Sequence, residues 1–505
     1  MSPMSPTQIK DGELMAAADL GSNSFHLVVA RCEHGEPRVI DRVRDSVRLA
    51  AGLHSDGTLD AERRERAMAC LARFGQRMAD IPATHVRAVA TNAVRQLKSP
   101  GRFLADAEGA LGHPVEVVSG REEGRLIFLG VSHALPLSRE RRLVMDIGGG
   151  STEFIIGRHL EPQLTESVQV GCVASSLRFF RGGKITRKRW QRARHEIGVL
   201  LQQFTEDFRD TGWLEAYGSS GTAKAIGNAV TELRLSDDGI TAEALAGLRE
   251  RVLEAGHVDR INLPGVNGDR SPVIAGGIAI LEAAFEALGI ERMQVCESAM
   301  REGLLWDLLG RAGGTDPRAS SIDSLATRYG VDKAQARRVE ATALMLFDQV
   351  ANAWQLDAEA REWLSWAARV HELGLAIAHS QHHHHGGYIL RNADLAGFSR
   401  QEQHLLAACV ECHRRKPDRD VIAALPPRHR ELARHITTLL RLAVLLRRGR
   451  RPEPLPAIGL AVRDGALRLS LPTEWIGQHP LTEADLKQEQ ALLADVGSHL
   501  ELCLV

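Results

Sequence analysis

The sequence predicts an α/β fold in which two similar domains flank a cleft, followed by a mostly α-helical domain and a small C-terminal domain. Three observations predict it. One strand-turn-strand segment occurs twice, strands and helices alternate around both copies, and helical periodicity dominates after residue 325. The predicted domains are residues 1–126, 127–312, 313–450 and 451–505. Four domains suit a chain of 505 residues, because one domain usually spans roughly 100 to 200.

Composition excludes several classes of protein. Hydrophobic residues make up 44% and charged residues 25%, as in ordinary globular proteins and unlike disordered chains or membrane bundles. Lys and Arg number 63 against 64 for Asp and Glu, so no overall field would select nucleic acid as a partner. The seven cysteines are mostly far apart, and Met1–Lys10 lacks the basic start of a signal peptide. We therefore expect a cytoplasmic protein, with a peripheral position at the inner face of the cell membrane as an alternative.

The repeated segment is the most informative feature. Asp19–Ala30 and Asp146–Gly157 align without a gap, and Asp19 matches Asp146. Each copy follows a short apolar run and continues into a second one, with Gly and Ser between them. This pattern predicts two hairpins with small-residue tips, one in each of two similar domains.

The tips have the composition of phosphate-binding loops. Glycines allow the backbone N–H groups to approach phosphate oxygens closely, and Ser or Thr hydroxyls add donors. The Asp before each turn supplies a carboxylate that can hold a hydrated Mg²⁺ or orient a water molecule. A third such loop, Gly218–Thr222, is expected between a strand at Leu214–Tyr217 and a helix beginning near Ala223. One such loop alone is more often a tight turn, but three loops, two of them matching, favour binding. The candidate substrate-binding residues of the three loops are Asp19, Gly21, Ser22, Asn23, Ser24, Gly148, Gly149, Gly150, Ser151, Thr152, Gly218, Ser219, Ser220, Gly221 and Thr222.

Two carboxylates are expected at the start of a helix that follows the strand Val115–Val118. Glu122 and Glu123 lie in the first turn of this helix, where the helix dipole favours negative charge, so a purely stabilising role is one interpretation. Glu123 also leads a helix that follows a strand, which is where α/β sheets bring side chains into a ligand crevice. Both interpretations stay open at this point.

These motifs occur in the order found in a known family. The chain resembles the exopolyphosphatase and guanosine pentaphosphate phosphatase family, within the actin, Hsp70 and sugar-kinase fold group, and the similarity continues through Arg301–Gly303 to Leu373–Leu375. The resemblance implies that the two α/β domains are actin-like (RNase H-like). The segments that carry it are Asp19–His26, Ser119–Glu123, Asp146–Glu153, Gly171–Cys172 and Ser220–Thr222.

The resemblance also implies a reaction, the hydrolysis of a terminal phosphoanhydride bond. Glu123 matches the family's general base, and Thr91 and Arg95 match residues that contact phosphate. Asp146 and Glu153 would support Mg²⁺, with Mn²⁺ as an alternative and a monovalent cation as a further cofactor. The implied partners are inorganic polyphosphate or guanosine pentaphosphate (pppGpp), and the implied assembly is a homodimer.

Four functions are compatible with these loops. The first is processive removal of terminal phosphate from polyphosphate, and the second is conversion of pppGpp to ppGpp. An actin-like or Hsp70-like ATP-driven machine is a third, although no purine-binding signature is recognisable. The fourth is a polyphosphate sensor without turnover, against which the carboxylate of Glu123 speaks.

The second half holds further conspicuous residues. Its helices resemble the HD-type phosphohydrolase fold, but His371-Glu372 stands where that superfamily has His-Asp, so we expect no metal site there. The run His382–His385 is expected in a loop, and neither its role nor that of Cys409 and Cys412 follows from the sequence. Basic residues, mostly arginines, concentrate between Arg414 and Arg451, with only Asp418, Asp420 and Glu431 opposing them locally. This basic run is predicted either to hold a phosphate polymer or to be a solvated helix end.

Overall fold

The computed structural model consists of two compact units, one formed by residues 8–315 and the other by residues 316–505. We call them the α/β unit and the helical unit. The described residues are 9–136, 138–268, 270–313, 316–494 and 498–505. The expectation for Met1–Lys10 falls largely outside them. The sequence also predicts a linker near Gly310–Pro317, and the middle of this segment lies outside them as well. The four domain boundaries stay predictions.

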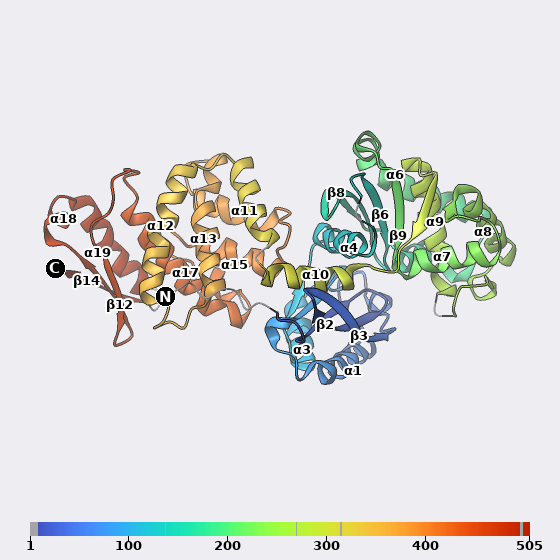
Figure 1. Cartoon of the computed structure of the whole chain (residues 1–505), viewed down its shortest axis with the longest axis horizontal. Helices are drawn as coiled ribbons and strands as arrows, with labels where there is room; N and C mark the ends of the chain where they lie inside the picture. Colours follow the sequence, from blue (N-terminus) through green and yellow to red (C-terminus); the bar gives the residue numbers. More distant parts are fainter. Residues whose placement is uncertain (1–8, 137, 269, 314–315, 495–497) are drawn as a thin grey trace. The chain divides into compact units, whose positions relative to one another are not determined.

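The α/β unit contains two sheets with the same topology (Figure 1). In the first, β1 pairs antiparallel with β2 and parallel with β4. In the second, β6 pairs antiparallel with β7 and parallel with β9, so the strand order β3-β2-β1-β4-β5 is matched by β8-β7-β6-β9-β11. The repeated segment therefore does mark two similar α/β folds, as predicted. The strands are β1 Leu14–Leu20, β2 Phe25–Glu33, β3 Glu36–Asp45, β4 Val86–Ala90, β5 Val115–Val117, β6 Arg142–Ile147, β7 Thr152–Arg158, β8 Glu161–Val168, β9 Glu215–Ser219, β10 Ile240–Thr241 and β11 Arg292–Val295.

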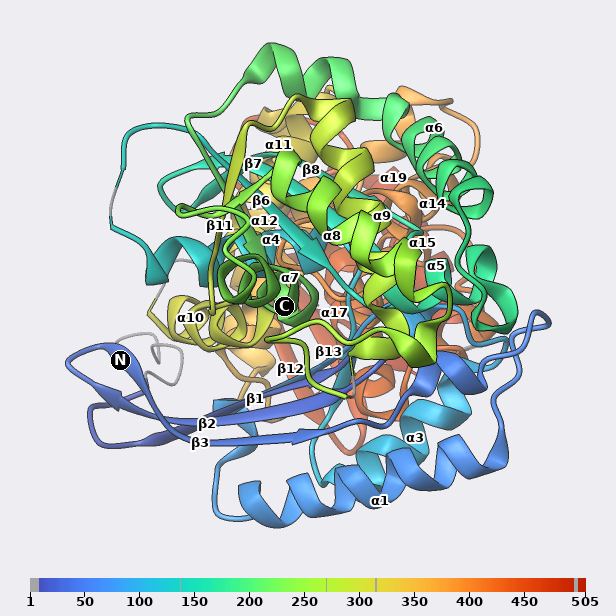
Figure 2. The ribbon, with the colours of Figure 1, turned by 90° about the vertical axis from the view of Figure 1, so that its right-hand side faces the viewer.

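Helices cover these sheets. Figure 2 shows α1 and α3 together on one side of β1, β2 and β3, where Leu71 and Phe74 pack beneath the sheet. Trp190 and Phe204 of α6 pack with α9 in a separate core on the second sheet. The helices of this unit are α1 Ala61–Met78, α2 Asn92–Arg95, α3 Pro100–Leu111, α4 Gly120–Ala134, α5 Cys172–Phe179, α6 Arg187–Thr211, α7 Ser220–Glu232, α8 Ala242–Ala255, α9 Ser271–Leu288 and α10 Met300–Ala312.

A third core joins the two halves of the α/β unit. It contains Met15 from β1, Phe128 from α4, Val144 from β6 and Leu304 from α10, all fully buried. Helix α10 packs against α4 and β1, so the end of the segment expected as the second domain returns to the first sheet. This shared core fixes the two hairpin tips relative to each other.

Helix α9 is unusually apolar. Among the described helices it alone has the length and composition to span a membrane, and 72% of that stretch is buried within the fold. Its packing is that of a core helix, with Ile278 and Leu281 fully buried.

The helical unit is a bundle followed by a three-stranded sheet, in agreement with the predicted helical domain and small C-terminal domain. Trp363, Leu364, Ala367 and Val370 of α13 are buried on one face, as the periodicity predicts. In the sheet, β13 lies between β12 and β14. The elements are α11 Pro317–Arg328, α12 Lys333–Val350, α13 Ala358–Val370, η5 Leu373–Ala376, α14 His382–Asn392, α15 Arg400–Glu411, α16 Arg419–Ala423, α17 Pro427–Leu446, β12 Gly459–Arg463, β13 Ala466–Leu471, α18 Thr473–Gly477, α19 Pro480–Ala494 and β14 His499–Leu504.

One expectation for this unit is wrong. The histidines from His382 to His385 form the first turn of α14 and not a loop, because Gln381 in left-handed conformation starts the helix there. The arginines of the basic run also face more acids than the local sequence shows. Arg441 is fully buried and paired with Glu489, which lies 48 residues further along the chain.

Candidate active site

The two matched hairpin tips approach each other at one end of the sheets. A Cβ atom on Gly149 would lie 3.3 Å from the Cβ of Ser22, and one on Gly150 would collide with Asn92. The two glycines therefore let the second tip lie against the first tip and the start of α2 without displacing Ser22 or Asn92. Between the tips lies a cavity of about 330 Å³.

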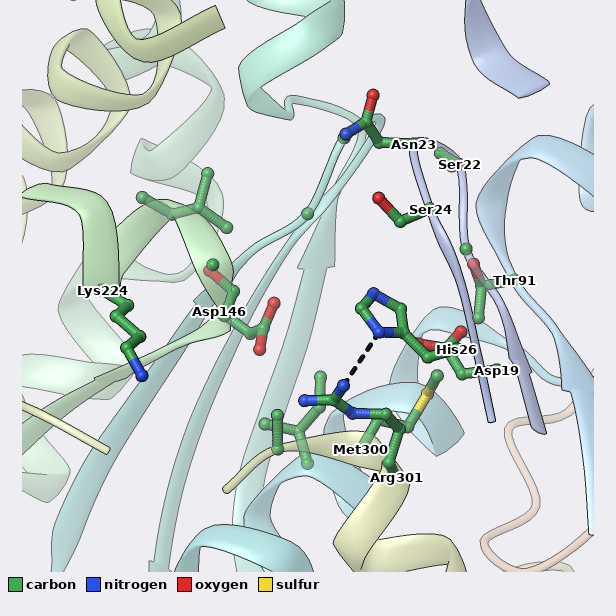
Figure 3. A pocket seen from close by; sticks show the side chains of 18 of the residues that line it. Asp19, Ser22, Asn23, Ser24, His26, Thr91, Asp146, Lys224, Met300 and Arg301 are labelled. Carbon is green, nitrogen blue, oxygen red and sulfur yellow. Dashed lines mark hydrogen bonds between the residues drawn. The ribbon is translucent and has the colours of Figure 1, made fainter. Parts of the chain in front are cut away.

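The register of the hairpins places the carboxylates. Asp19 pairs with His26 across the first hairpin, and Asp146 pairs with Glu153 at the equivalent position of the second. Figure 3 shows Asp146 and Lys224 on one side of the cavity, and Asp19, His26 and Thr91 on the other. The similar folds thus bring two aspartates to face each other across the same space.

Glu123 reaches the cavity from the first turn of α4. Ser119 caps this helix by accepting a hydrogen bond from the Glu122 N–H. The Arg95 Nη1 atom donates to Glu123 Oε2 at 3.0 Å and to the Val118 carbonyl at 2.8 Å, whereas its Nη2 atom is buried without a partner. An unpaired buried guanidinium N–H beside a carboxylate is costly unless a ligand such as a phosphate oxygen completes it.

The carboxylates lie in a charged environment that disfavours their ionisation. Burial, with repulsion from Glu123, raises the pKa of Asp19 to about 8. Burial also raises the pKa of Asp146 to about 6, although the Ser219 hydroxyl donates a 2.6 Å hydrogen bond to its Oδ2 atom. The pKa of Glu153 lies well above its ordinary value because of burial and of repulsion from Glu123 and Asp146. A bound cation would relieve this repulsion.

Mg²⁺ fits this donor set. The oxygens are hard ligands, and Asp19 Oδ1 is buried without a hydrogen-bond partner. Within the described ranges, no three His, Cys, Asp or Glu residues are already arranged as a complete metal site. A magnesium ion here would therefore take one or two carboxylates, from Asp146 and its neighbours, and complete its shell with water and substrate phosphate.

The structure brings together most of the residues predicted from the sequence. The predicted residues that line the cavity are Asp19, Gly21, Ser22, Asn23, Ser24, Thr91, Glu123, Asp146, Gly148, Gly149, Ser151, Ser220 and Gly221. The others lie behind it: Arg95, Gly150, Thr152, Glu153, Gly218, Ser219 and Thr222 do not line it.

Two of the residues behind the cavity use their hydroxyl groups in hydrogen bonds within the protein. Thr152 Oγ1 donates to the Val170 carbonyl at 2.5 Å, and Ser219 Oγ donates to Asp146. The loop expected at Gly218–Thr222 is also different in detail, since β9 extends to Ser219 and α7 begins at Ser220. Ser220 has a φ of 82° and joins strand to helix without an intervening loop.

Several basic residues of the cavity were missed by the sequence analysis. Arg301 Nη1 donates to His26 Nδ1 at 2.9 Å, and burial with the nearby Arg301 charge lowers the pKa of His26 to about 2. The sequence did contain a signal for His26 and Arg301, because these residues belong to the motifs Asp19–His26 and Arg301–Gly303. Arg42 and Arg44 alternate along β3 and so share one face of the sheet. The basic lining residues not predicted are His26, Arg42, Arg44, Lys224, Arg270 and Arg301.

Comparison with known proteins agrees with this geometry. Residues 28–312 match the Ppx/GppA phosphatase family, and residues 318–490 match domain III of the Ppx/GppA phosphatases. The chain belongs to the Ppx/GppA phosphatase family. It is a phosphatase of phosphoanhydride bonds with the actin-like fold that the resemblance implied.

A curated relative and two solved structures illustrate the match. The guanosine-5'-triphosphate,3'-diphosphate pyrophosphatase of Pseudoalteromonas translucida (strain TAC 125) is 36% identical over 483 residues, which cover 95% of this chain and 97% of the relative. An exopolyphosphatase from Cytophaga hutchinsonii has a TM-score of 0.53 at 23% identity, over 60% of this chain and 98% of that one. An exopolyphosphatase-like protein has the same TM-score of 0.53 at 24% identity, over 59% and 98%. These structures share the fold of the α/β unit.

Proposed function

We propose that this chain hydrolyses the terminal phosphoanhydride bond of inorganic polyphosphate and releases orthophosphate. The observation that carries the proposal is the cavity between the two hairpin tips, where Glu123, held by Arg95, meets phosphate-type donors from both sheets. Phosphoryl transfer needs chiefly positioning and charge neutralisation, together with one carboxylate that orients water.

Glu123 is the residue placed to activate the water molecule. Arg95 holds one of its oxygens, so the other is left to accept a proton from water. The water oxygen forms a bond to the terminal phosphorus, the bridging P–O bond breaks, and the electron pair leaves with the shortened chain. The burial-raised pKa of Glu123 makes it a stronger base than an exposed glutamate.

The remaining groups neutralise the phosphates. Backbone N–H groups at the tips and at the start of α7 form anion sites, and α7 adds the positive end of its dipole. The guanidinium of Arg301 and the ammonium of Lys224 line the same cavity. Asp146 and Glu153 would hold Mg²⁺, whose positive charge would help to neutralise the substrate. Such a set suits a substrate that is phosphate throughout.

A second candidate is hydrolysis of guanosine pentaphosphate. The relative that is 36% identical over 95% of this chain carries that activity in its name, which favours this substrate. The lining of the cavity favours polyphosphate, since no Phe, Tyr or Trp is among the described residues that line it. A guanine base would meet Ile127, Ile147, Cys296, Ala299 and Met300 as apolar partners among the described lining residues, whereas stacking on aromatic rings is a common mode of base recognition.

One assay separates the candidates. Phosphate release from long-chain polyphosphate, guanosine pentaphosphate and ATP is measured with the same enzyme concentration and saturating Mg²⁺. We expect kcat/KM to be highest for polyphosphate, and Glu123→Gln to lower the rate of release from every substrate by about 10² to 10⁴. A higher kcat/KM for guanosine pentaphosphate would replace the first proposal by the second, and a preference for ATP would refute both.

A further inference from the structure

The helical unit contains a polar cavity of its own, of about 350 Å³. It lies among the end of α13, η5, the start of α14, the turn after α15, and the helices α17 and α19. The resemblance to HD-type folds assigned no function to this place, because Glu372 follows His371 where that superfamily has Asp. The cavity is nevertheless lined by histidine rings and by charged side chains that contact one another.

Two buried histidines line this cavity with defined tautomers. His371 Nδ1 lies 2.7 Å from the Ala368 carbonyl and His413 Nδ1 lies 2.5 Å from the Val410 carbonyl. A carbonyl oxygen only accepts, so each Nδ1 must carry the hydrogen, and each Nε2 of the neutral ring is an acceptor. Burial lowers the pKa of both imidazoles, which keeps them neutral. The two ring centroids are 5.5 Å apart, so one small ligand could contact both.

The arginines of the cavity outnumber the acids available to them. Arg450 pairs with Glu372 and Asp332, and Arg448 pairs with Asp485 at 2.5 Å. The sequence analysis of the basic run did not anticipate these acidic partners, which are Glu372, Asp332 and Asp485. By contrast, Arg414 and Arg415 form no ion pair with a described residue.

Arg414 is also oriented by a third histidine. Its Nη1 atom lies 3.0 and 3.1 Å from the two ring nitrogens of His382, and His382 Nδ1 lies 3.3 Å from the His379 carbonyl. His382 therefore accepts from Arg414 through Nε2 and fixes the guanidinium at the cavity. Burial and the positive charges of Arg415 and Arg448 lower the pKa of Arg414, although the nearby carboxylate of Glu372 opposes this shift.

These features favour an anion over a metal ion. Imidazole acceptors alone would suit Zn²⁺ or Ni²⁺, but the Arg414 and Arg415 charges repel a cation. In the part of the chain that the structure describes, no three His, Cys, Asp or Glu side chains are arranged to hold a metal. A ligand matching all the groups must accept hydrogen bonds from guanidinium and donate one to a neutral imidazole.

We propose that this cavity is a second phosphate site, which binds a phosphate group that still carries an ionisable hydroxyl. Arg414 and Arg415 would bind the charged oxygens, and the P–O–H group would donate to Nε2 of His371 or His413. Orthophosphate and the terminal phosphate of a longer phosphate compound both present this chemistry near neutral pH. The site belongs to the helical unit and does not depend on which substrate the α/β unit hydrolyses.

The test uses the full chain and hydrogen exchange, which reports on each segment separately. Orthophosphate should slow exchange in residues 371–382 and 410–416 of the wild type. Arg414→Gln and Arg415→Gln should each weaken this protection by about tenfold or more in apparent Kd, since charge-assisted hydrogen bonds are lost. Protection of residues 19–26 and 146–153 by orthophosphate should stay unchanged in both variants. The matched control is Arg419→Gln, an exposed arginine outside the cavity, and it should have no effect on either site.

Three comparisons decide between ligands. Sulfate has the shape of phosphate but no ionisable hydroxyl, so it should bind at least about tenfold more weakly; equal protection by sulfate would refute the role of the two imidazoles. Tripolyphosphate tested beside orthophosphate shows whether the free ion or a chain end binds better, and protection by either supports the site. Protection of these segments by Zn²⁺ or Ni²⁺ and by neither phosphate compound would overturn the proposal. Unchanged phosphate protection in Arg414→Gln and Arg415→Gln would overturn it as well, since both folded variants would then lack the proposed contacts.

Discussion

Arg95 and Glu123 form a buried ion pair in which Nη1 of Arg95 lies 3.0 Å from Oε2 of Glu123, while Nη2 of Arg95 has no partner. Arg95 keeps the carboxylate oriented and counteracts the effect of burial on its pKa. The first two predictions follow from this pair.

Glu123→Gln should keep the fold and substrate binding but lower kcat by about 10² to 10⁴, because the amide cannot take the proton of the attacking water. Phosphate-release kinetics and a thermal unfolding curve measure the two properties. Glu62→Gln, at an exposed first-turn glutamate of α1, is the control and should be fully active. Wild-type turnover in the Glu123 variant would show that this glutamate only stabilises the helix terminus.

Arg95→Gln should move the acidic limb of the kcat/KM profile to higher pH. Burial raises the pKa of Glu123 and the Arg95 charge opposes that rise, so removing the charge leaves the base protonated up to a higher pH. The profile is measured from pH 5 to 9 beside Arg102→Gln, an exposed arginine of α3. An unshifted limb with reduced kcat would mean that Arg95 acts only on the substrate.

In metal-free buffer, the wild type should lose stability as the pH rises. Asp19→Asn should remove this loss. The folded pKa of Asp19 is about 8, above its ordinary value of 3.8, so between these values the unfolded chain binds fewer protons and the free energy of unfolding falls as pH rises. The fall is on the order of a few kcal/mol by the linkage relation. Urea unfolding at pH 5 and pH 8 measures it. Equal pH dependence in wild type and variant would contradict the assignment.

Asp146→Asn and Glu153→Gln should each raise the Mg²⁺ concentration needed for half-maximal activity, because oxygen ligands of a hard cation are lost. Mg²⁺ titrations of phosphate release give this value. Asp237→Asn removes an exposed carboxylate at the surface and should leave the titration unchanged. Full activity of the wild type in excess chelator would refute the metal requirement itself.

Asp307→Asn should destabilise the α/β unit by about 3 to 5 kcal/mol, the usual cost of breaking a buried ion pair. Asp307 of α10 is fully buried and pairs with Arg87 of β4 and Arg125 of α4, and its Oδ2 also accepts from Arg311 at 2.8 Å. The three charges hold its pKa far below the ordinary range. Asp323→Asn, at an exposed acid of the helical unit, should change stability by less than about 1 kcal/mol in the same urea experiment. Equal loss in both variants would show that burial of the network does not matter.

Much of this protein follows from its sequence alone. Helix α1 follows from a local pattern, because its five buried residues recur at helical spacing and so form one apolar face. The repeat Asp19–Ala30 and Asp146–Gly157 predicted two hairpins and two similar sheets, since the same local pattern folds in the same way. The position of Glu123 in the first turn of a helix after a strand also required only local information.

The tertiary structure alone decided which charged groups meet. Arg301 reaches His26 across 275 residues, and Arg450 reaches Glu372 across 78. Periodicity shows that a residue faces the core or the solvent, but it does not show which distant residue shares that face. The same holds for the raised pKa of Asp19, which comes from burial and from Glu123 and exists only when both hairpins are packed together. Local sequence thus set the elements and their catalytic groups, whereas long-range packing set the pairing and the charge state of those groups, because both depend on desolvation and distances that no single segment determines.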